Sequence, residues 1–285
     1  MTTIPTIAVL LTCHNRKDKT LECLQALYMQ EGLGSNYEID IFLVDDGSTD
    51  RTSIEVKLKY PLVNVIEGTG HLFWNQGMRL AWQNARIKDY DFYLWLNDDT
   101  LLDKDALIKI IEVYIEAKDF EQKEVIITGA CRKELNDNSF SYGGSTNFGP
   151  VHPNGKIQKC EFINGNAVLV SKGIYQKIGI LSNDYTHGMG DFDYGLRALK
   201  RGFYCYTTKG FVATCAPNEG IPGWCNPDVS FAKRWKLFHS PRGLNIKEYI
   251  RFRKKFWGIK WINFTVKAYL KMISPKLYKK IAELI

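Results

Sequence analysis

Three polar segments of the sequence combine carboxylate and amide side chains that suit the binding of phosphates and metal ions. They are Thr12-Cys13-His14-Asn15-Arg16, Asp45-Asp46-Gly47-Ser48-Thr49-Asp50 and Asn97-Asp98-Asp99-Thr100, and each follows a short apolar run. Hard cations such as Mg²⁺ prefer oxygen ligands and commonly hold the phosphate groups of a substrate as well. Three such turns at one edge of a sheet would form a pocket for a divalent cation and a diphosphate.

A fourth segment, Gly188-Met189-Gly190-Asp191-Phe192-Asp193, precedes a stretch that we expect to be helical as far as Arg201. Its glycines permit a tight turn, and the helix dipole stabilises a carboxylate in the first helical turn. This segment and 45–50 have a simpler alternative, which is a turn that caps the next helix. For 97–100 that alternative accounts for one acidic residue but not for two adjacent ones.

The elements that must position these segments alternate through the first half of the chain. Continuous apolar runs, typical of strands buried on both faces, lie at 7–11, 39–44, 63–66, 92–96 and 125–128. Amphipathic stretches typical of helices lie between them at 17–30, 50–58, 75–86 and 103–117. The alternation predicts an α/β fold with a mostly parallel central sheet flanked by helices, in which ligands bind at the carboxyl ends of the strands.

The composition of the 285-residue chain is that of a globular enzyme, with 45% hydrophobic and 24% charged residues. Its formal net charge of +7 is unevenly distributed. Residues 233–285 hold 15 Lys and Arg against 2 Asp and Glu, a charge of +13, whereas residues 1–232 hold 23 against 29, a charge of −6. The charge therefore divides the chain into a mildly acidic body over 1–232 and a basic region over 233–285, which we expect to be separate parts.

Cysteine usage and the N-terminus bear on the compartment. The 7 cysteines are odd in number and include no Cys-x-x-Cys pair, so neither a disulfide framework nor a zinc site is indicated. The N-terminus lacks the basic region of a signal peptide, and no uninterrupted apolar run reaches the length of about 18 residues typical of a membrane span. These features predict a cytoplasmic protein.

Taken together, the four polar segments resemble those of the inverting nucleotide-sugar glycosyltransferases of family 2, which have the GT-A fold. The resemblance covers residues 5–215 and rests on the order of Val44-Asp45-Asp46-Gly47-Ser48-Thr49-Asp50, Leu96-Asn97-Asp98-Asp99 and Gly190-Asp191-Phe192-Asp193. More narrowly, Phe73-Trp74-Asn75-Gln76-Gly77-Met78 and Ser240-Pro241-Arg242-Gly243 are similar to features of bacterial members that build capsule, O-antigen and related surface polysaccharides, including the rhamnosyltransferase-like group.

The resemblance implies a GT-A catalytic domain over 1–232, with a nucleotide-binding half at about 1–130 and an acceptor half at about 131–232, followed by the basic amphipathic helical region over 233–285. It also implies that the turns after the first strands hold the nucleotide, with Asp45 or Asp46 accepting a hydrogen bond from the base or ribose. The residues that it assigns to nucleotide binding are Thr12, His14, Asn15, Arg16, Asp45, Asp46, Gly70, Asn75, Asn97 and Asp98.

The resemblance also assigns roles in the reaction. Asp191 aligns with the catalytic base, and Asp99 together with Asp98 aligns with the metal-binding Asp-x-Asp motif, which implies a Mn²⁺ or Mg²⁺ cofactor. Acceptor contacts or support of the site would come from His187, Asp193, Arg197 and Trp74, although His187 could equally be structural and Trp74 a core residue.

The sequence departs from the family's metal motif at two places. Asn97 stands at the first Asp position, and the segment 212–218 lacks the late histidine that many relatives place there. Both departures point to a metal shell with fewer protein ligands.

Residues 247–273 repeat apolar residues at a three-four spacing, which predicts one amphipathic helix. The apolar positions are 249, 252, 256, 259, 262, 266, 270 and 273. Basic residues beside an aromatic, apolar stripe are typical of a helix in an anionic membrane interface. The alternatives are a helix packed on the acidic body and a surface that binds nucleic acid, and we do not expect the latter.

The sequence thus predicts an enzyme that transfers a sugar from a UDP- or dTDP-type nucleotide sugar to a glycan or lipid-linked glycan at the inner face of the cytoplasmic membrane. A homo-oligomer is compatible with this prediction. Two other functions stay open. A nucleotidyltransferase also combines an α/β sheet with a cation, but it needs a basic glycine-rich phosphate loop that is not seen here. A non-catalytic scaffold would keep the nucleotide pocket and the membrane contact.

Overall fold

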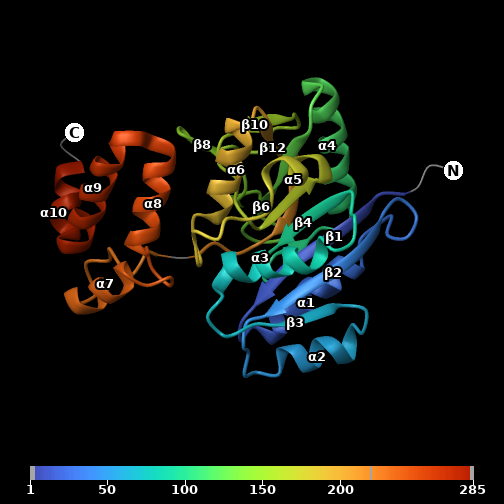
Figure 1. Ribbon diagram of the computed structural model, residues 1–285, viewed down its shortest axis with the longest axis horizontal. Coiled ribbons are helices and arrows are strands. Elements are labelled where there is room, and N and C mark those ends of the chain that lie inside the picture. Colours follow the sequence, from blue (N-terminus) through green and yellow to red (C-terminus); the bar gives the residue numbers. More distant parts are fainter. Residues whose placement is uncertain (1–3, 219, 283–285) are drawn as a thin grey trace. The chain divides into compact units, whose positions relative to one another are not determined.

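The computed structural model describes residues 4–218 and 220–282 (Figure 1). The chain divides into two compact units, Met1–Asn183 with Gly190–Pro217 and Asp184–Met189 with Asn218–Ile285. The second unit therefore includes residues 218–232, which the division drawn from the sequence places in the catalytic domain.

The first unit is built on one large mixed sheet. In the order in which they pair, its main strands are β10 (Gln158–Cys160), β12 (Tyr204–Thr214), β6 (Val125–Arg132), β11 (Ala167–Ser171), β4 (Phe92–Leu96), β1 (Thr6–Cys13), β2 (Glu38–Asp45) and β3 (Asn64–Glu67). The short strands β5 (Leu101–Leu102) and β7 (Phe140–Tyr142) pair with β12 and β6, and β8 (Ser145–Thr146) pairs with β9 (Gly149–Pro150).

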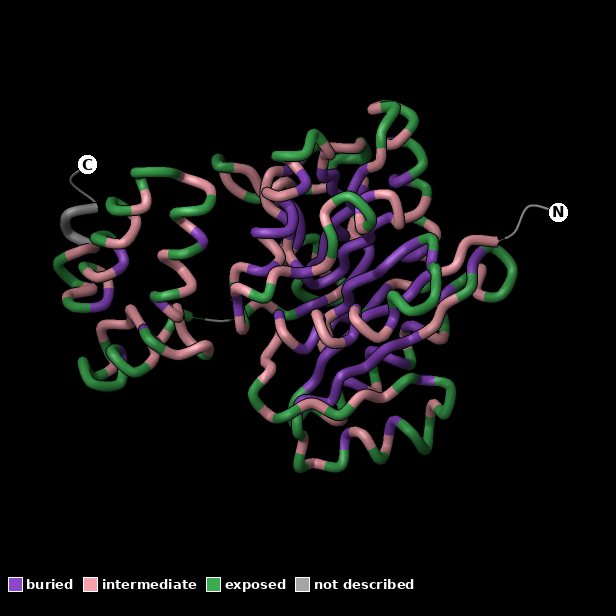
Figure 2. The backbone as a smooth tube through the Cα atoms, viewed as in Figure 1, coloured by how far each residue is buried: buried purple, intermediate pink, exposed green. Residues whose placement is uncertain are grey.

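Strand direction follows the prediction of a mostly parallel sheet. Pairing is parallel between β1 and β2, β1 and β4, β2 and β3, and β6 and β12. Strand β11 is antiparallel to both of its neighbours, β4 and β6. Every residue of β4, β6 and β11 is buried, and Figure 2 shows these central strands as continuous purple stretches. The apolar runs of the sequence are therefore strands covered on both faces.

Helices cover both faces of this sheet. Helices α1 (Lys17–Tyr28), α2 (Thr52–Lys59) and α4 (Ala106–Glu121) contribute to the hydrophobic cluster that contains Ile7 and Val9 of β1. Helices α3 (Phe73–Ala85), α5 (Lys172–Ile178) and α6 (Gly190–Lys200) contribute to the cluster that contains Ala8 and Leu10. Successive residues of β1 thus serve opposite cores, as the two-residue period of a strand requires.

The predicted strands and helices of the first half are all present, with boundaries that differ by a few residues. The helix predicted over 103–117 is α4, which begins later, at Ala106. Asp103 belongs instead to the preceding turn, where its N–H donates to the carbonyl of Val212 (2.9 Å) and its carboxylate pairs with Arg132 of β6 (Nη1–Oδ2 2.9 Å).

The second unit is helical. It consists of α7 (Phe231–Phe238), α8 (Ile246–Trp257), the 3-10 turn η1 (Gly258–Lys260), α9 (Trp261–Ile273) and α10 (Pro275–Ala282). Phe238, Ile246, Ala268 and Met272 form its buried core.

The prediction of one continuous helix over 247–273 is wrong. The turn η1 separates α8 from α9, and Gly258 there has a φ of 51°, a left-handed conformation that glycine adopts at low cost. Within the described residues, no helix combines the length and the hydrophobicity that crossing a bilayer requires.

Candidate active site

The predicted site residues of the first unit gather at one edge of the sheet. Because β1, β2, β3 and β4 run parallel, the turns that follow them lie at the same edge. The antiparallel strand β11 begins at this edge, since Ala167 pairs with Leu96. Strand β12 ends there, because it is parallel to β6, which in turn is antiparallel to β11. Strand β6 ends at this edge too, since its last residue, Arg132, pairs with Thr214 of β12, so that seven strand ends surround the candidate site.

The acidic pair after β2 holds neighbouring loops in place. Both carboxylate oxygens of Asp46 accept backbone N–H groups, from Gly70 at Oδ1 (2.7 Å) and from Leu72 and Phe73 at Oδ2 (2.8 and 2.9 Å). Phe73 has a φ of 56°, an uncommon conformation for a bulky residue that these bonds help to hold. The carboxylate of Asp46, which is 4% exposed, thus fixes the loop 68–73.

Asp45 also accepts backbone N–H groups, in its case from the residues that follow it in the chain. Its two oxygens accept the N–H groups of Ser48 (2.9 Å) and Ser53 (3.1 Å). The carboxylates of Asp45 and Asp46 thus hold the loops around them, and the predicted contact of one of them with the base or ribose stays a prediction. The alternative drawn from the sequence, a turn that caps the next helix, holds only in part. The N-cap residue of α2 is Arg51, whose side chain makes no capping bond, although Asp50 Oδ1 accepts the N–H of Thr52 (3.1 Å).

The turn after β1 is bonded to the turn after β2. His14 Nδ1 donates to the carbonyl of Asp46 (2.7 Å), and Asn15 accepts the N–H of Thr49 at Oδ1 (2.7 Å). Asn15 also receives support through its own N–H, which Ser48 Oγ accepts (2.9 Å). Thr12, at the end of β1, packs its side chain against Gly77 of α3. These contacts join His14 and Asn15 to the turn after β2, and through Asp46 to Gly70, whereas Thr12 contacts α3.

The turn after β4 carries two carboxylates that converge on one guanidinium. Arg16 Nη1 donates to Asp98 Oδ1 (3.1 Å) and to Asp99 Oδ2 (2.8 Å). Burial raises the pKa of Asp98 to about 6, although Arg16 acts in the opposite direction. Burial would lower the pKa of Arg16, but the charges of Asp98 and Asp99 outweigh it and raise that pKa. The carboxylates of Asp98 and Asp99 thus favour a positive charge between them.

The same carboxylates fit a hard divalent cation. They are adjacent in sequence, they present oxygens toward a single positively charged group, and Asp99 is the more exposed of the two. Among residues 4–218 and 220–282, no group of three or more His, Cys, Asp or Glu side chains is arranged to hold a metal ion. A cation here would therefore take its other ligands from phosphate oxygens and water.

Trp74 connects the turn after β4 to the beginning of β11. Its indole Nε1 donates to Asn97 Oδ1 (2.6 Å), and its ring lies so close to Gly165 that a β-carbon there would approach the ring to 2.2 Å. Only glycine fits at position 165 without a shift of this ring. Trp74 also contacts the buried ring of Trp95, with centroids 6.3 Å apart. It is therefore partly a core residue and partly a support for Asn97.

Asp191 lies at the first turn of α6. Its Oδ2 accepts the N–H of Gly165 (3.2 Å), and its Oδ1 accepts the N–H of Phe192 (2.8 Å). Burial raises the pKa of Asp191 to about 6, and the two backbone donors oppose part of that rise. A carboxylate with this pKa is ionised at pH 7 and is more basic than an ordinary aspartate, which suits it to accept a proton.

Three further predicted site residues, two in α6 and one in α3, hold the start of α6 in place. Arg197 Nε donates to Asp193 Oδ2 (2.7 Å), and its other nitrogens donate to the carbonyls of Ile178 and Ile180. Asn75 Nδ2 donates to the carbonyl of Ser182 (2.9 Å), and its amide lies where a β-carbon of residue 190 would be. Asp193, Arg197 and Asn75 thus support α6, the helix that carries Asp191. His187 lies in the segment 184–189, which belongs to the second unit.

The structure adds a residue that the sequence did not indicate. Cys215, directly after β12, places its Sγ 3.8 Å from Asp99 Oδ1 and 3.0 Å from Asn166 Nδ2. Burial raises the pKa of this thiol to about 11, with Asp99 contributing. The sequence offers one clue to this residue, because Cys215 lies in the segment 212–218, where many relatives have a late histidine.

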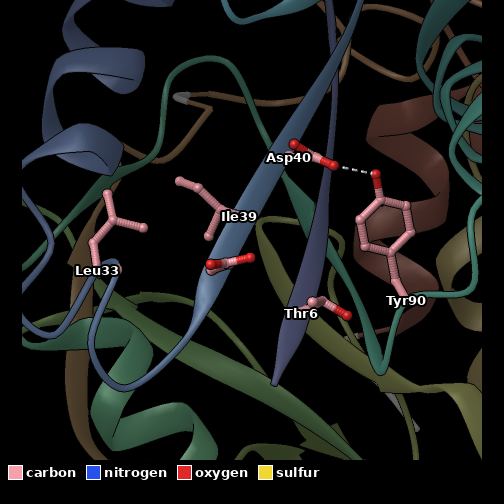
Figure 3. A pocket seen from close by; sticks show the side chains of 7 residues that line it. Thr6, Leu33, Ile39, Asp40 and Tyr90 are labelled. Atoms are coloured by element: carbon pink, nitrogen blue, oxygen red, sulfur yellow. Dashed lines mark hydrogen bonds between the residues drawn. The ribbon is translucent and has the colours of Figure 1, made fainter. Parts of the chain in front are cut away.

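A pocket of about 220 Å³ lies at the opposite edge of the sheet and is lined by Thr6, Leu33, Gly34, Glu38, Ile39, Asp40 and Tyr90 (Figure 3). These residues precede or begin strands whose other ends form the candidate site. Asp40 Oδ2 accepts the hydroxyl of Tyr90 (2.5 Å) and the ammonium of Lys88 (2.9 Å). Two of the polar lining residues, Asp40 and Tyr90, are therefore bonded to each other, and Thr6 is bonded to Asp91 (2.9 Å) outside the lining.

The fold and the site together define a GT-A glycosyltransferase that uses a nucleotide sugar. The chain belongs to glycosyl transferase family 2, whose family model matches residues 8–178. A relative from Methanococcus voltae, dolichyl N-acetyl-alpha-D-glucosaminyl phosphate 3-beta-D-2,3-diacetamido-2,3-dideoxy-beta-D-glucuronosyltransferase, is 23% identical over 267 residues, which cover 90% of this chain and 77% of the relative.

Solved structures with a similar fold come from several glycosyltransferases. A mannosyltransferase from Pyrobaculum calidifontis, in complex with GDP-Man and Mn²⁺, is 16% identical with a TM-score of 0.57, covering 94% of this chain and 74% of that one. TarS from S. aureus, in complex with UDP-GlcNAc, is 12% identical with a TM-score of 0.57, covering 93% and 85%. GalNAc-T7 with UDP, GalNAc and Mn²⁺ is 14% identical with a TM-score of 0.68, and this chain covers 54% of its length. These likenesses confirm the predicted GT-A fold.

Proposed function

We propose that this enzyme transfers a sugar with inversion, using Asp191 as the base that activates the acceptor hydroxyl. The observation that carries the proposal is the placement of Asp191 at the helix start, bonded to Gly165, with its pKa raised to about 6. The proposed reaction is a single displacement. The acceptor oxygen forms a bond to the anomeric carbon, the bond from that carbon to the diphosphate oxygen breaks, and the hydroxyl proton passes to Asp191.

The opposite side of the reaction requires stabilisation of the leaving diphosphate. We assign Asp99 and Asp98 to holding a divalent cation, which when bound supplies positive charge to the diphosphate. Arg16 contacts both carboxylates, and we expect its guanidinium to contact a phosphate of the bound donor as well. Two structural neighbours hold Mn²⁺, which supports a divalent cation as the cofactor of this enzyme too.

The nucleotide is proposed to lie against the turns after β1, β2 and β3. Thr12, His14, Asn15 and Gly70 would contact it, with Asp45 and Asp46 holding the turns. Asn97 uses its amide oxygen to accept from Trp74, so its amide nitrogen is the group that we expect to donate to the nucleotide sugar. This assignment explains how an asparagine functions at the first position of the Asp-x-Asp motif.

The acceptor that we propose is a glycan or a lipid-linked glycan of the kind from which cell-surface polysaccharides are assembled. The name of the Methanococcus voltae relative describes a dolichyl-phosphate-linked sugar as its acceptor, which supports the lipid-linked class. Membership of the bacterial surface-polysaccharide and rhamnosyltransferase-like group stays a prediction, because that relative is archaeal.

The experiment that tests the function measures release of nucleoside diphosphate from a panel of UDP-, dTDP- and GDP-sugars, with and without Mn²⁺ and an acceptor. A glycosyltransferase releases the diphosphate in an acceptor-dependent manner from at least one donor. Binding of a donor without any release, across acceptors of the glycan and lipid-linked types, would instead support the non-catalytic scaffold.

Trp74→Phe is expected to lower kcat/KM for the donor about threefold to tenfold. The substitution keeps a ring beside Gly165 but removes the N–H that Asn97 accepts, and such a bond contributes about 0.5–1.5 kcal/mol. Steady-state kinetics measure the change, and Trp235→Phe at an exposed position of α7 is the matched control. Native kinetics in Trp74→Phe would show that Asn97 does not depend on this bond.

Arg16→Gln is expected to strengthen the binding of Mn²⁺ to the nucleotide-free protein about tenfold, because a cation no longer competes with the guanidinium for Asp98 and Asp99. A thermal-shift titration with Mn²⁺ gives the midpoint concentration. Arg51→Gln removes an exposed arginine of the same unit and should leave the midpoint unchanged. A midpoint that stays native in Arg16→Gln would place the cation away from these carboxylates.

A further inference from the structure

The outer face of α9 carries an exposed apolar stripe. Ile262, Val266, Leu270 and Ile273 are 43%, 52%, 40% and 53% exposed, and we call these four residues the α9 stripe. At about 100° per residue they lie within about a quarter of the helix circumference. The opposite side of α9 is buried in the core of the second unit through Ala268 and Met272. The helix therefore has one face that packs and one apolar face that meets solvent.

The structure separates two parts of the apolar pattern that the sequence presents as one. In α8, Phe252 is buried and its ring contacts those of Tyr185 and Trp257 within the second unit. Arg253 lies over the rings of Trp257 and Phe264, at 4.5 and 4.2 Å from their centroids. The α8 part thus stabilises the unit itself, whereas the α9 part, together with Ile259 of η1, which is 77% exposed, is presented at the surface.

The charge around the α9 stripe is of one sign. Residues 249–282 contain no Asp or Glu, and their ten basic residues are Arg251, Arg253, Lys254, Lys255, Lys260, Lys267, Lys271, Lys276, Lys279 and Lys280. Lys260 and Lys267 are exposed and lie just before and within α9. An isologous contact with a second copy would bring these like charges together. Anionic lipid headgroups, in contrast, complement them while the acyl region accepts the apolar side chains.

We propose that the α9 stripe docks on an anionic lipid surface, with α9 lying in the plane of the interface. Ile262, Val266, Leu270 and Ile273 enter the boundary between headgroups and acyl chains, and Lys260 and Lys267 contact the headgroups. The inference deepens the proposed function, because a lipid-linked acceptor is held in such a surface. Its test nevertheless needs neither donor nor acceptor, so its failure and the failure of the proposed function are separate results.

The test is co-sedimentation of the full chain with vesicles of phosphatidylcholine alone and of phosphatidylcholine mixed with phosphatidylglycerol. Native protein is expected to bind the mixed vesicles at least tenfold more tightly than the neutral ones. Val266→Asp and Leu270→Asp should each weaken binding to the mixed vesicles at least tenfold, and Lys260→Gln with Lys267→Gln should weaken it with a shallower salt dependence. Leu62→Asp, at an 81% exposed position of the first unit, is the matched control and should bind like the native protein.

Three outcomes would overturn the proposal. The first is native protein that stays in the supernatant with the mixed vesicles. The second is that Val266→Asp and Leu270→Asp both bind the mixed vesicles like the native protein while their thermal unfolding is also native. The basic residues alone would then account for the binding. The third is a dimer that Val266→Asp converts to a monomer in light scattering, since the α9 stripe would then join two copies of this chain.

Discussion

Asp191→Asn is expected to reduce kcat by about 10³–10⁴-fold, the upper part of the range for a general base. The amide cannot accept the proton of the acceptor hydroxyl. The neighbouring carboxylate of Asp193 cannot substitute for it, because Asp193 is fully buried and paired with Arg197. Release of nucleoside diphosphate at saturating donor and acceptor measures the change.

The binding of donor separates a lost base from a damaged site. Asp191 lies on the acceptor side of the proposed reaction, so Asp191→Asn should bind the nucleotide sugar as the native protein does. Asp119→Asn, at an exposed position near the end of α4, controls for the loss of one negative charge and should keep native kcat. A loss of donor affinity comparable to the loss of kcat would refute the role of Asp191 as base.

The pH dependence of the native enzyme follows from the same residue. The raised pKa of about 6 means that the active carboxylate form of Asp191 is present above pH 6 and is lost as the pH falls through that value. Burial also raises the pKa of Asp98 to about 6, so donor affinity is measured over the same range. Where kcat/KM falls more steeply with decreasing pH than donor affinity does, we attribute the excess to protonation of Asp191. A flat kcat between pH 5 and 8 would contradict the assignment.

Asp99→Asn is expected to lower kcat/KM by about 10²–10³-fold in the presence of Mn²⁺, the cost of removing one group that stabilises charge in a transition state. Asp99 is the more exposed of the two carboxylates that converge on Arg16, and it is therefore the one that a cation reaches first. The concentration of Mn²⁺ for half-maximal activity should rise together with the loss.

The control variant for Asp99→Asn, and the result that would contradict its role, both concern the dependence of activity on Mn²⁺. Asp105→Asn changes an exposed carboxylate of the next turn, which pairs with Lys109, and should leave the Mn²⁺ dependence unchanged. Native enzyme that binds donor and turns it over equally with Mn²⁺ and with a chelator would contradict the role assigned to Asp99. Arg16 would then be the cation that faces the diphosphate.

The sequence was sufficient for the parts of the fold that rest on local patterns. Apolar runs such as 92–96 predict strands because a strand buried on both faces cannot hold polar side chains. The rule that ligands bind at carboxyl strand ends then brings the turns after β1, β2 and β4 together, and the structure does the same.

What the sequence could not provide depends on contacts between distant segments. The antiparallel strand β11 places Gly165 beside Trp74 and Asp191, and β12 places Cys215 beside Asp99, yet neither pairing has a local signal. The sequence also does not reveal that the carboxylates of Asp45 and Asp46 accept backbone N–H groups from nearby loops. The helix over 247–273 was predicted as continuous because periodicity does not reveal that Gly258 adopts a left-handed conformation.

The most direct test of the central claim is the anomeric configuration of the first product formed by the native enzyme, observed by proton NMR during turnover. A single displacement with Asp191 as the base predicts the opposite configuration to that of the donor, so an α-linked nucleotide sugar gives a β-linked product. A product that retains the configuration of the donor would contradict the account, because retention requires either a second displacement or attack from the side of the leaving group.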